Sequence, residues 1–441
     1  VREFARRTAD VYIEIEGLPP SQERKTTNQD QIDHFLTSLD AQTGCGPLST
    51  DRWLKAFALL DKQIDDAKKT VVMLDEVSWM GQDDATFPGV LRTAWETYWH
   101  RHERLVVVIC GSSSTWIKKN ILGDTGFTGR FSRDYEIPEL TLRECAEFWA
   151  PALDRIAPRE IFDVLSVTGG VPRYLEEMDI GLSADENIRR MCFSKGGELF
   201  KDFDALFDPL LGADIPLKRN ILESLVDGPK TGHELSESVG GAYNGRLNDV
   251  VRDLVGGGFV ADDQGKNPET GEETRISKYR LKDNYTRFYL KYVMPHKGEI
   301  ERGAFVYSSM EQLPEWNAVR GLQFENLIVN NFREVIPFLG IGATIVESAA
   351  PYRNARKCGQ KRGLQIDLLV QTACTAYVVE VKRKKRIEGE IEREVAEKVK
   401  RLPLRKGMSV RPALVYCGEI DPQVEARGYF DALIPAEKLL R

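Results

Sequence analysis

Two acidic residues and a lysine interrupt an otherwise apolar stretch in the C-terminal part of the chain. The stretch QIDLLVQTACTAYVVEVKRKKR begins at Gln365, and the three residues are Asp367, Glu380 and Lys382. A carboxylate within an apolar strand is costly to bury unless it is paired or binds a cation. Oxygen ligands suit Mg²⁺, and a lysine beside the metal can orient the attacking water. One interpretation is therefore a divalent-metal site for phosphodiester hydrolysis; the alternative is a hairpin whose charges face solvent.

Two predicted strands would position these side chains. Apolar, β-branched and aromatic residues fill 364–370 and 375–381, and a polar turn separates them. Upstream, residues 317–336 show helical spacing of apolar side chains, with Glu325 among them. The remaining predicted elements are a strand at 344–347, a helix at 388–402 and strands at 413–417 and 432–434.

Basic residues surround this candidate site. From Pro351 to Arg411 the chain has 17 Lys and Arg against 7 Asp and Glu, a net charge of +10. The net charge of the whole chain is −7, so the remaining residues together carry −17. A basic segment in an acidic protein indicates a polyanionic partner. For any single cation, a solvated surface position is the simpler interpretation. The candidate contacts to a DNA backbone are Arg353, Arg356, Lys361, Arg362, Arg383, Lys384 and Lys385, with Arg386 beside them.

The order and spacing of these elements resemble the PD-(D/E)XK nuclease superfamily, most of all its Holliday-junction-resolvase and restriction-endonuclease relatives. Asp367 is followed, after twelve residues, by Glu380-Val-Lys382, and Glu325 matches an extra acid that those relatives carry on the first helix. Ile366 stands where proline often precedes the first acid. The resemblance implies that Asp367, Glu380 and Glu325 hold Mg²⁺ or Mn²⁺ and that Lys382 positions the water.

A second candidate site lies in the N-terminal third. The apolar strand TVVML ends on Asp75 and Glu76, and the strand LVVVIC ends in a glycine and three serines. Acids at the carboxyl end of a buried parallel strand lie where α/β sheets bind ligands. Asp75 would hold Mg²⁺ through water, and Glu76 would polarise the water that attacks a nucleotide. Ser112 or Ser113 would sense the γ-phosphate. The alternatives are acids that begin a helix and serines that form a turn.

These motifs resemble the archaeal-type AAA+ ATPases, which border the STAND class of signal-transducing NTPases. Gly129-Arg130, Pro138 and the segment TGGVPRYLE from Thr168 complete the pattern, and the resemblance covers Val1 to about Phe207. It implies that Asp75 and Glu76 form the Walker B motif, that Ser112 or Ser113 is sensor 1, that Arg130 faces phosphate, and that Gly170 and Pro172 begin the lid helix that packs on adenine.

The phosphate loop of that family does not occur in the sequence. No G-x-x-x-x-G-K-[ST] is present in the 441 residues. In the family, this loop immediately precedes a helix much like V-R-E-F, so we expect the given chain to begin just after it. Without the loop's backbone amides and lysine, the β- and γ-phosphates have no cradle. ATP binding is therefore expected only if such a loop lies upstream.

The middle of the chain predicts a winged helix. Residues 216–281 read as three helices followed by a hairpin, which is the order of that fold. The third helix would be the recognition helix, with Tyr243, Asn244, Arg246 and Asn248 as candidate base or backbone contacts. The alternative is a winged helix that serves only as a packing module.

The predicted fold class is α/β, with an AAA+ core at 1–138, a helical lid at 139–210, a winged helix at 211–300 and a nuclease-like domain at 301–441. The predicted function is a metal-dependent DNA endonuclease coupled to an ATP-binding module. The alternative is a nucleotide-sensing, DNA- or protein-binding regulator of STAND type whose nuclease fold does not cut. A homo-oligomer is compatible with both. Seven scattered cysteines, no signal peptide and no membrane-length apolar run predict a cytoplasmic protein with reduced thiols.

Overall fold

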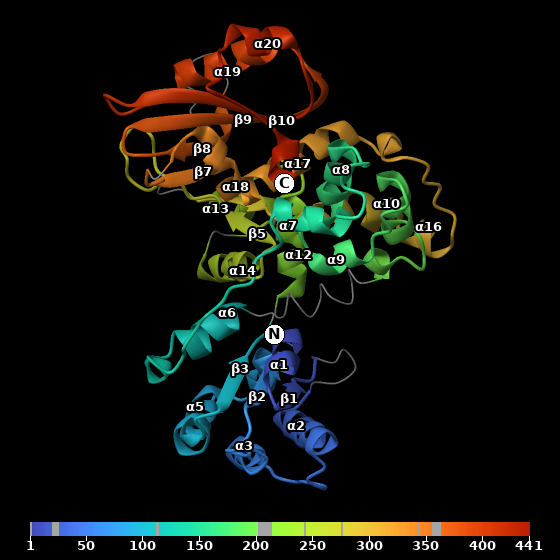
Figure 1. The fold of residues 1–441 in the computed structure, drawn as a ribbon, viewed down its shortest axis with the longest axis vertical. Helices are drawn as coiled ribbons and strands as arrows, with labels where there is room; N and C mark the ends of the chain where they lie inside the picture. The colour runs from blue at the N-terminus through green and yellow to red at the C-terminus, as the bar shows by residue number, and fades with distance from the viewer. Residues whose placement is uncertain are drawn as a thin grey trace. The chain divides into compact units, whose positions relative to one another are not determined.

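The computed structural model describes residues 2–19, 26–111, 114–201, 214–241, 244–274, 277–342, 344–354 and 363–441. The described chain forms two units, one reaching to Glu136 and the other starting at Ile137 (Figure 1). Both combine helices with a β-sheet, so the predicted α/β class is confirmed. No helix within the described ranges is long and apolar enough to cross a membrane.

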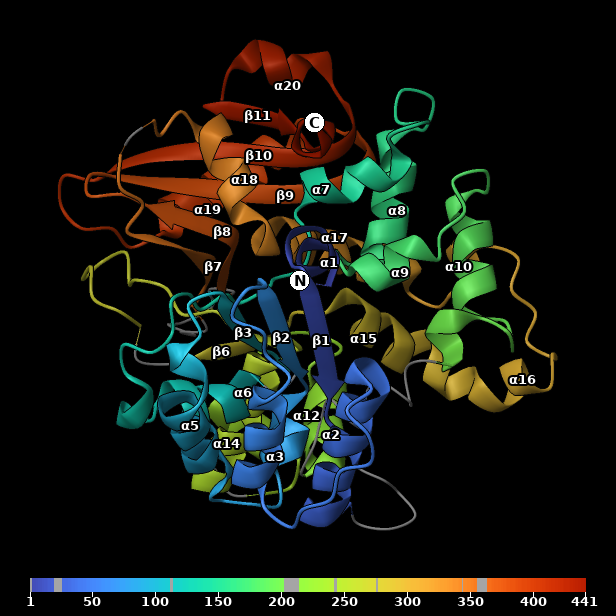
Figure 2. The ribbon, with the colours of Figure 1, turned by 60° about the horizontal axis from the view of Figure 1, so that its bottom comes forward.

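The first unit is built on a parallel sheet with the strand order β1-β2-β3 (Figure 2). Val72 pairs with Ile13 on one side and Val107 on the other. The strands are β1 (Val11–Glu16), β2 (Thr70–Asp75) and β3 (Leu105–Ile109), and the main helices are α1 (Arg2–Thr8), α2 (Asn28–Thr43), α3 (Trp53–Asp61), α4 (Val77–Gly81) and α5 (Phe87–Thr97).

Aromatic side chains from three helices form the core of the first unit. Trp53 stacks on Phe57, and Phe35 and Phe87 meet Trp53 edge-on. Offset and edge-on pairs of this kind contribute beyond their buried area. The apolar residues that recur at helical spacing in α2 are all buried: Ile32, Phe35, Leu36 and Leu39.

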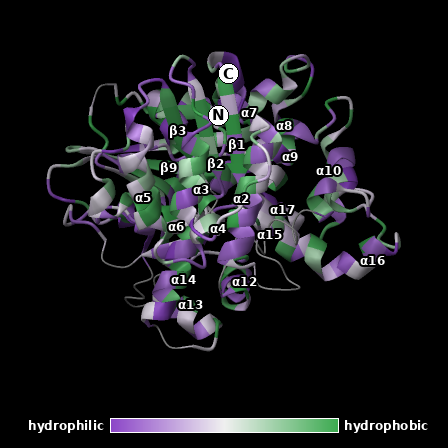
Figure 3. Cartoon of the chain, turned by 90° about the horizontal axis from the view of Figure 1, so that it is seen from below, coloured by the Kyte–Doolittle hydropathy of each residue, from purple (hydrophilic) through white to green (hydrophobic). Residues whose placement is uncertain are grey.

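Strand β3 is less buried than its apolar run LVVVI would indicate. Val106 is 45% exposed, whereas β2 is buried from Thr70 to Leu74. The reason is position, because β3 lies at the edge of the described sheet. Figure 3 shows the hydrophobic colour concentrated on the strands of this unit.

A buried histidine joins two segments of the first unit. The His102 side chain is 7% exposed, its Nε2 lies 2.9 Å from Asp61, and its Nδ1 contacts Asp66. Burial alone would lower the pKa of His102, but the hydrogen bonds to Asp66 and Asp61 outweigh it, so the pKa is raised above its usual value. Both ring nitrogens can donate to a carboxylate only in the protonated form.

The stability of the first unit should therefore fall as the pH rises. Because the folded pKa of His102 is raised, its contribution is fully present below about pH 6.5, its unfolded pKa, and is lost as the pH passes through the folded value. Melting temperatures measured from about pH 6 to pH 9 should show this decline in wild type and a smaller one in His102→Gln. The exposed His233 provides the matched control, and an unaltered decline in His102→Gln would refute the assignment.

The second unit begins with short helices: α7 (Leu142–Ala146), α8 (Pro158–Thr168), α9 (Pro172–Glu176) and α10 (Ala184–Cys192). Three further helices and a small antiparallel sheet follow in the order predicted for a winged helix. The helices are α12 (Ile215–Ser224), α13 (Gly232–Ser238) and α14 (Gly245–Gly256), and the sheet β4-β6-β5 comprises Lys230–Thr231, Lys278–Leu281 and Val260–Asp262. The buried Lys218 of α12 lies 3.1 Å from Asp253 of α14 and ties these helices together.

The C-terminal sheet has five strands in the order β11-β10-β9-β8-β7, of which β7, β8 and β9 are antiparallel and β9, β10 and β11 are parallel. Helices α19 and α20 pack on one face of it (Figure 1). The strands are β7 (Ser348–Asn354), β8 (Leu364–Gln371), β9 (Thr375–Ile387), β10 (Ser409–Ile420) and β11 (Ala432–Pro435); the helices are α15 (Asn284–Phe288), α16 (Lys297–Glu301), α17 (Trp316–Asn330), α18 (Phe332–Val335), α19 (Glu390–Arg401) and α20 (Pro422–Arg427).

Several predicted boundaries in this part of the chain are wrong, among them that of β10, which spans Ser409–Ile420 rather than 413–417. The strand expected at 344–347 instead forms as β7, which begins at Ser348. It pairs with β8 along the whole of that strand, from Gln371 to Leu364. Strand β9 extends to Ile387 and takes in the basic run, because β10 pairs with it along that length.

The hairpin loop between β5 and β6, residues 263–274, packs against the C-terminal sheet. Lys266 donates its backbone N–H to Ser348 Oγ at 3.0 Å, and its Nζ lies 3.1 Å from Glu347. Gln371 Nε2 donates to Lys266 O at 2.8 Å, and Arg405 N donates to Pro268 O at 3.0 Å. This loop therefore contacts the C-terminal sheet through its backbone and the Lys266 side chain.

Candidate active site

Strands β8 and β9 separate at the predicted acids. Their backbone pairing runs from Leu368↔Val379 to the turn. Just beyond it, Asp367 Oδ2 accepts a hydrogen bond from Val381 N at 2.9 Å. The carboxylate thus pairs with the Val381 N–H, which has no β8 backbone partner beyond the end of the strand pairing. Asp367 is buried, with only 4% of its surface exposed.

Glu380 lies between two lysines. Its side chain is completely buried, with Oε1 2.6 Å from Lys382 Nζ and Oε2 2.5 Å from Lys398 Nζ. The contact between Oε1 and Lys382 is an ion pair whose geometry does not meet the criteria for a hydrogen bond. Paired ammonium groups offset the cost of burying this charge.

Lys398 was not predicted from the sequence. It lies on α19 on the same helical face as the buried Ile391 and Val395. The sequence did contain a sign of this contact, because Lys398 follows Ile391 and Val395 on one helical face. A charged side chain on a buried face needs a partner inside the protein.

Glu325 of α17 completes the group of acids. Burial and the nearby Asp367 charge raise the pKa of Glu325 to about 8, so it is largely protonated at neutral pH. Two buried neighbours fix this helix: Gln323 accepts a hydrogen bond from Arg287, and Asn326 accepts one from Arg280. The structure therefore brings all four predicted residues of this site together.

The close approach of these acids and Lys382 shifts their pKa values. Burial and the charge of Glu380 raise the pKa of Asp367. Burial alone would lower the pKa of Lys382, but Glu380 and Asp367 outweigh it and raise it. Acids whose pKa values are shifted by burial and by neighbouring charges are concentrated at functional sites.

The donor chemistry fits Mg²⁺ or Mn²⁺. Asp367, Glu380 and Glu325 carry carboxyl oxygens, the ligand type that these hard cations prefer. Among the residues that the structure describes, no group of three Asp, Glu, His or Cys side chains is arranged to hold a metal ion. The lysines take the cation's place beside Glu380, so a metal that binds this carboxylate must displace one of them.

The predicted DNA contacts differ in accessibility. Lys384 and Lys385 are exposed on β9, whereas Arg353 of β7 is half-buried and its Nε has no hydrogen-bond partner among the described residues. Arg246 is exposed and lies 2.5 Å from Asp214. Three further predicted contacts, Arg356, Lys361 and Arg362, and the recognition-helix candidate Tyr243 lie outside the described residues.

Arg383, a predicted DNA contact, is closed to solvent in this structure. Its side chain is 2% exposed and forms an ion pair with Asp163 of α8. Arg320 of α17 lies 3.9 Å from the same carboxylate. Successive residues of a strand point to opposite faces, so Arg383 points away from Lys382 and into the packing between β9 and α8.

The N-terminal candidate site lies at the carboxyl ends of β2 and β3. Asp75 Oδ2 accepts a hydrogen bond from Arg2 at 3.1 Å, and its Oδ1 lies 3.0 Å from Cys110 Sγ. Glu76 has φ 48° and ψ 46°, a left-handed conformation that is rare for a residue with a side chain. A methyl group on Gly111 would lie 3.5 Å from Glu76 Oε2, which places that carboxylate at the end of β3.

The remaining nucleotide predictions fall in several places. Ser112 and Ser113 lie outside the described residues. Arg130 forms an ion pair with Glu96. In the second unit, Leu140 N donates to Gly170 O at 2.8 Å, and a Cβ on Gly170 would lie 2.3 Å from Leu140 O, so only glycine fits. Pro172 begins α9.

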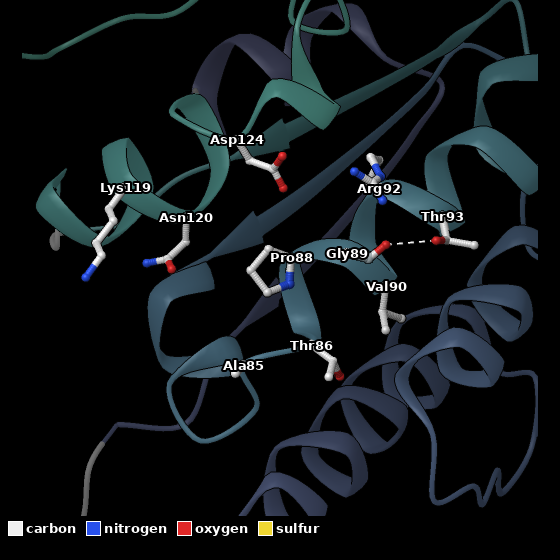
Figure 4. A pocket seen from close by; sticks show the side chains of 10 residues that line it. All are labelled: Ala85, Thr86, Pro88, Gly89, Val90, Arg92, Thr93, Lys119, Asn120 and Asp124. Atoms are coloured by element: carbon white, nitrogen blue, oxygen red, sulfur yellow. Dashed lines mark hydrogen bonds between the residues drawn. The ribbon is translucent and has the colours of Figure 1, made fainter.

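A separate hollow of about 620 Å³ lies beside α5 (Figure 4). Thr93 donates a hydrogen bond to Gly89 O on its wall. Arg92, Lys119 and Asp124 give it mixed charge, and its described lining includes none of Asp75, Glu76, Arg130, Gly170 and Pro172.

Comparison with known proteins gave distant similarities. No family model matches the chain. An uncharacterized protein of Methanocaldococcus jannaschii is 23% identical over 248 residues, which are 54% of this chain and 53% of that protein. The chain thus spans about half the length of this curated relative.

Among solved structures, the chain is similar to a Walker-type ATPase of Pyrococcus abyssi, with a TM-score of 0.43, 13% identity, and coverage of 64% of this chain and 84% of that one. It is also similar to the ORC2 protein of Aeropyrum pernix in its ADPNP–ADP complexes, with a TM-score of 0.33, 14% identity, and coverage of 67% and 82%.

Proposed function

We propose that the C-terminal domain is a metal-dependent nuclease that hydrolyses DNA phosphodiester bonds. The observation that supports it is the meeting of Glu325, Asp367, Glu380 and Lys382 where β8 and β9 separate. A purely structural cluster would be a poor explanation, because buried ion pairs are often no more stabilising than apolar residues of similar size. A domain that only grips DNA needs the cations but not two buried acids with a third, half-buried acid beside them.

The roles of the residues follow from their chemistry. Asp367 and Glu380 would hold the metal, with Glu325 as a further ligand. When bound, Mg²⁺ or Mn²⁺ would polarise the scissile phosphate and make water a better nucleophile. Lys382, whose side chain is 22% exposed, would position that water and stabilise developing negative charge. Lys384 and Lys385 would contact the DNA backbone without reading its sequence.

We further propose that the first unit belongs to a nucleotide-binding module of AAA+ type that regulates this nuclease. The support is local: Asp75 and Glu76 end β2 beside the end of β3, and Glu76 holds a strained conformation of the kind concentrated at functional sites. A nucleotide-sensing regulator without cutting activity remains the competing proposal. The packing of the hairpin loop against the C-terminal sheet supports a packing role for the predicted winged helix in either case.

The nuclease proposal is tested by cleavage of supercoiled plasmid and branched DNA in Mg²⁺ or Mn²⁺. We expect cleavage by wild type, none in EDTA, and a loss of about 100-fold or more in Lys382→Ala. Lys438→Ala, which removes an exposed lysine distant in sequence from the site, should cut like wild type. Equal cleavage by wild type and Lys382→Ala would refute the proposed role of this site.

A further inference from the structure

Helix α19 contributes a charged side chain to a buried carboxylate. Its apolar face carries Ile391 and Val395 into the core of the C-terminal domain. Lys398 lies on this face, and its Nζ approaches Glu380 Oε2 at 2.5 Å. The contact joins residues that are 18 positions apart on different elements.

The two lysines beside Glu380 are not equivalent. Lys382 lies two residues away on β9, and the charges of Glu380, Asp367 and Glu394 all act on it favourably. Among the described residues, the ion pair recorded for Lys398 is with Glu380 alone. The Asp367 charge acts on both lysines. The difference is one of position, because Lys382 belongs to the same strand as Glu380 whereas Lys398 reaches this carboxylate from α19.

Each oxygen of Glu380 is engaged by a lysine: Oε1 by Lys382 and Oε2 by Lys398. With both oxygens in contact with ammonium groups, this carboxylate cannot bind a divalent cation until one lysine withdraws. Lys398 is 22% exposed at its side chain and has a long flexible stem, so its head group can swing toward solvent.

We propose that Lys398 is a positioning residue that holds Glu380 in the metal-free protein and yields its place to the incoming divalent cation. The Lys398 ammonium group thus competes with the metal for the Glu380 carboxylate. This inference rests on the proposed metal-dependent nuclease. Metal binding is weakened by the free energy of the ion pair between Lys398 and Glu380, because that pair must break before the metal can bind this carboxylate.

The test measures Mn²⁺ binding to the full chain by electron paramagnetic resonance and by calorimetry, in wild type, Lys398→Met and Lys398→Arg. Met keeps the length and apolar contacts of the side chain but removes the competing charge, so we expect about tenfold tighter Mn²⁺ binding, because site charge sets affinity for hard cations. Arg can engage a carboxylate through two hydrogen bonds, so Lys398→Arg should bind Mn²⁺ more weakly than wild type.

A second readout is the melting temperature. In EDTA, Lys398→Met should melt below wild type because Glu380 loses a partner, and Mn²⁺ should raise its melting temperature by more than it raises that of wild type. Lys400→Met, which removes an exposed lysine from the same helix, should match wild type in both measurements.

The outcomes separate the two proposals. Mn²⁺ affinity that is unchanged or weaker in Lys398→Met overturns the role of Lys398. If that variant does not fold, Lys398→Arg decides the question, and an unchanged affinity there overturns the role equally. If wild type binds Mn²⁺ no more tightly than Asp367→Asn does, the metal-dependent nuclease itself fails.

Discussion

Asp367→Asn is expected to lose metal-dependent DNA cleavage by about 1,000-fold while remaining at least as stable as wild type. The loss of activity follows from the removal of a charged metal ligand. The stability follows from the surroundings of Asp367, which is 4% exposed and whose pKa is raised by burial and by the charge of Glu380. A raised pKa means that ionising this acid costs the folded state free energy above the unfolded pKa of about 3.9.

Asparagine removes that cost and keeps the local geometry. Its amide oxygen can still accept the hydrogen bond that Asp367 receives from Val381 N at 2.9 Å. Urea denaturation in EDTA at neutral pH should give an equal or larger free energy of unfolding, and plasmid cleavage in Mn²⁺ measures the activity. Asp431→Asn, which removes an exposed acid, should change neither quantity. A variant that still cuts would remove Asp367 from the mechanism, and a strongly destabilised variant would make the acid structural.

Arg383→Ala should lower the free energy of unfolding of the second unit by about 3–5 kcal/mol, because it leaves a buried acid without its counter-charge. The Arg383 side chain is 2% exposed and that of its partner Asp163 is 14% exposed. Arg320 lies 3.9 Å from the same carboxylate, too far to replace the direct contact fully. Chemical denaturation followed by circular dichroism measures the change.

The neighbouring residue provides the control. Lys384→Ala removes an exposed cation from the same strand and should alter stability by no more than about 0.5 kcal/mol. The double variant Asp163→Asn with Arg383→Met should recover part of the loss, because it removes both charges together. A phosphate contact, as the sequence first indicated for Arg383, would instead weaken DNA binding in a salt-dependent manner without a change in stability.

The sequence by itself determined the hairpin that carries the candidate site. Strand formation at β8 and β9 follows from apolar runs on either side of a polar turn, which are local patterns. The acids within those runs were conspicuous because a buried carboxylate needs a partner. Glu325 became a candidate through the resemblance of the helix and strand order, and the structure places it beside Asp367.

Only the tertiary structure decided which charges have partners inside the protein. Alternation along β9 separates Lys382 from Arg383, but the packing of α8 determines that the face of Arg383 is closed to solvent. Lys398 could not be assigned to Glu380 from spacing, because the contact depends on how α19 lies on the sheet. The exposure of β3 likewise depends on its place at the sheet edge rather than on its apolar residues. Sequence patterns fix local conformation over a few residues, whereas the partner of a charge is set by elements that folding brings together from far apart in the chain.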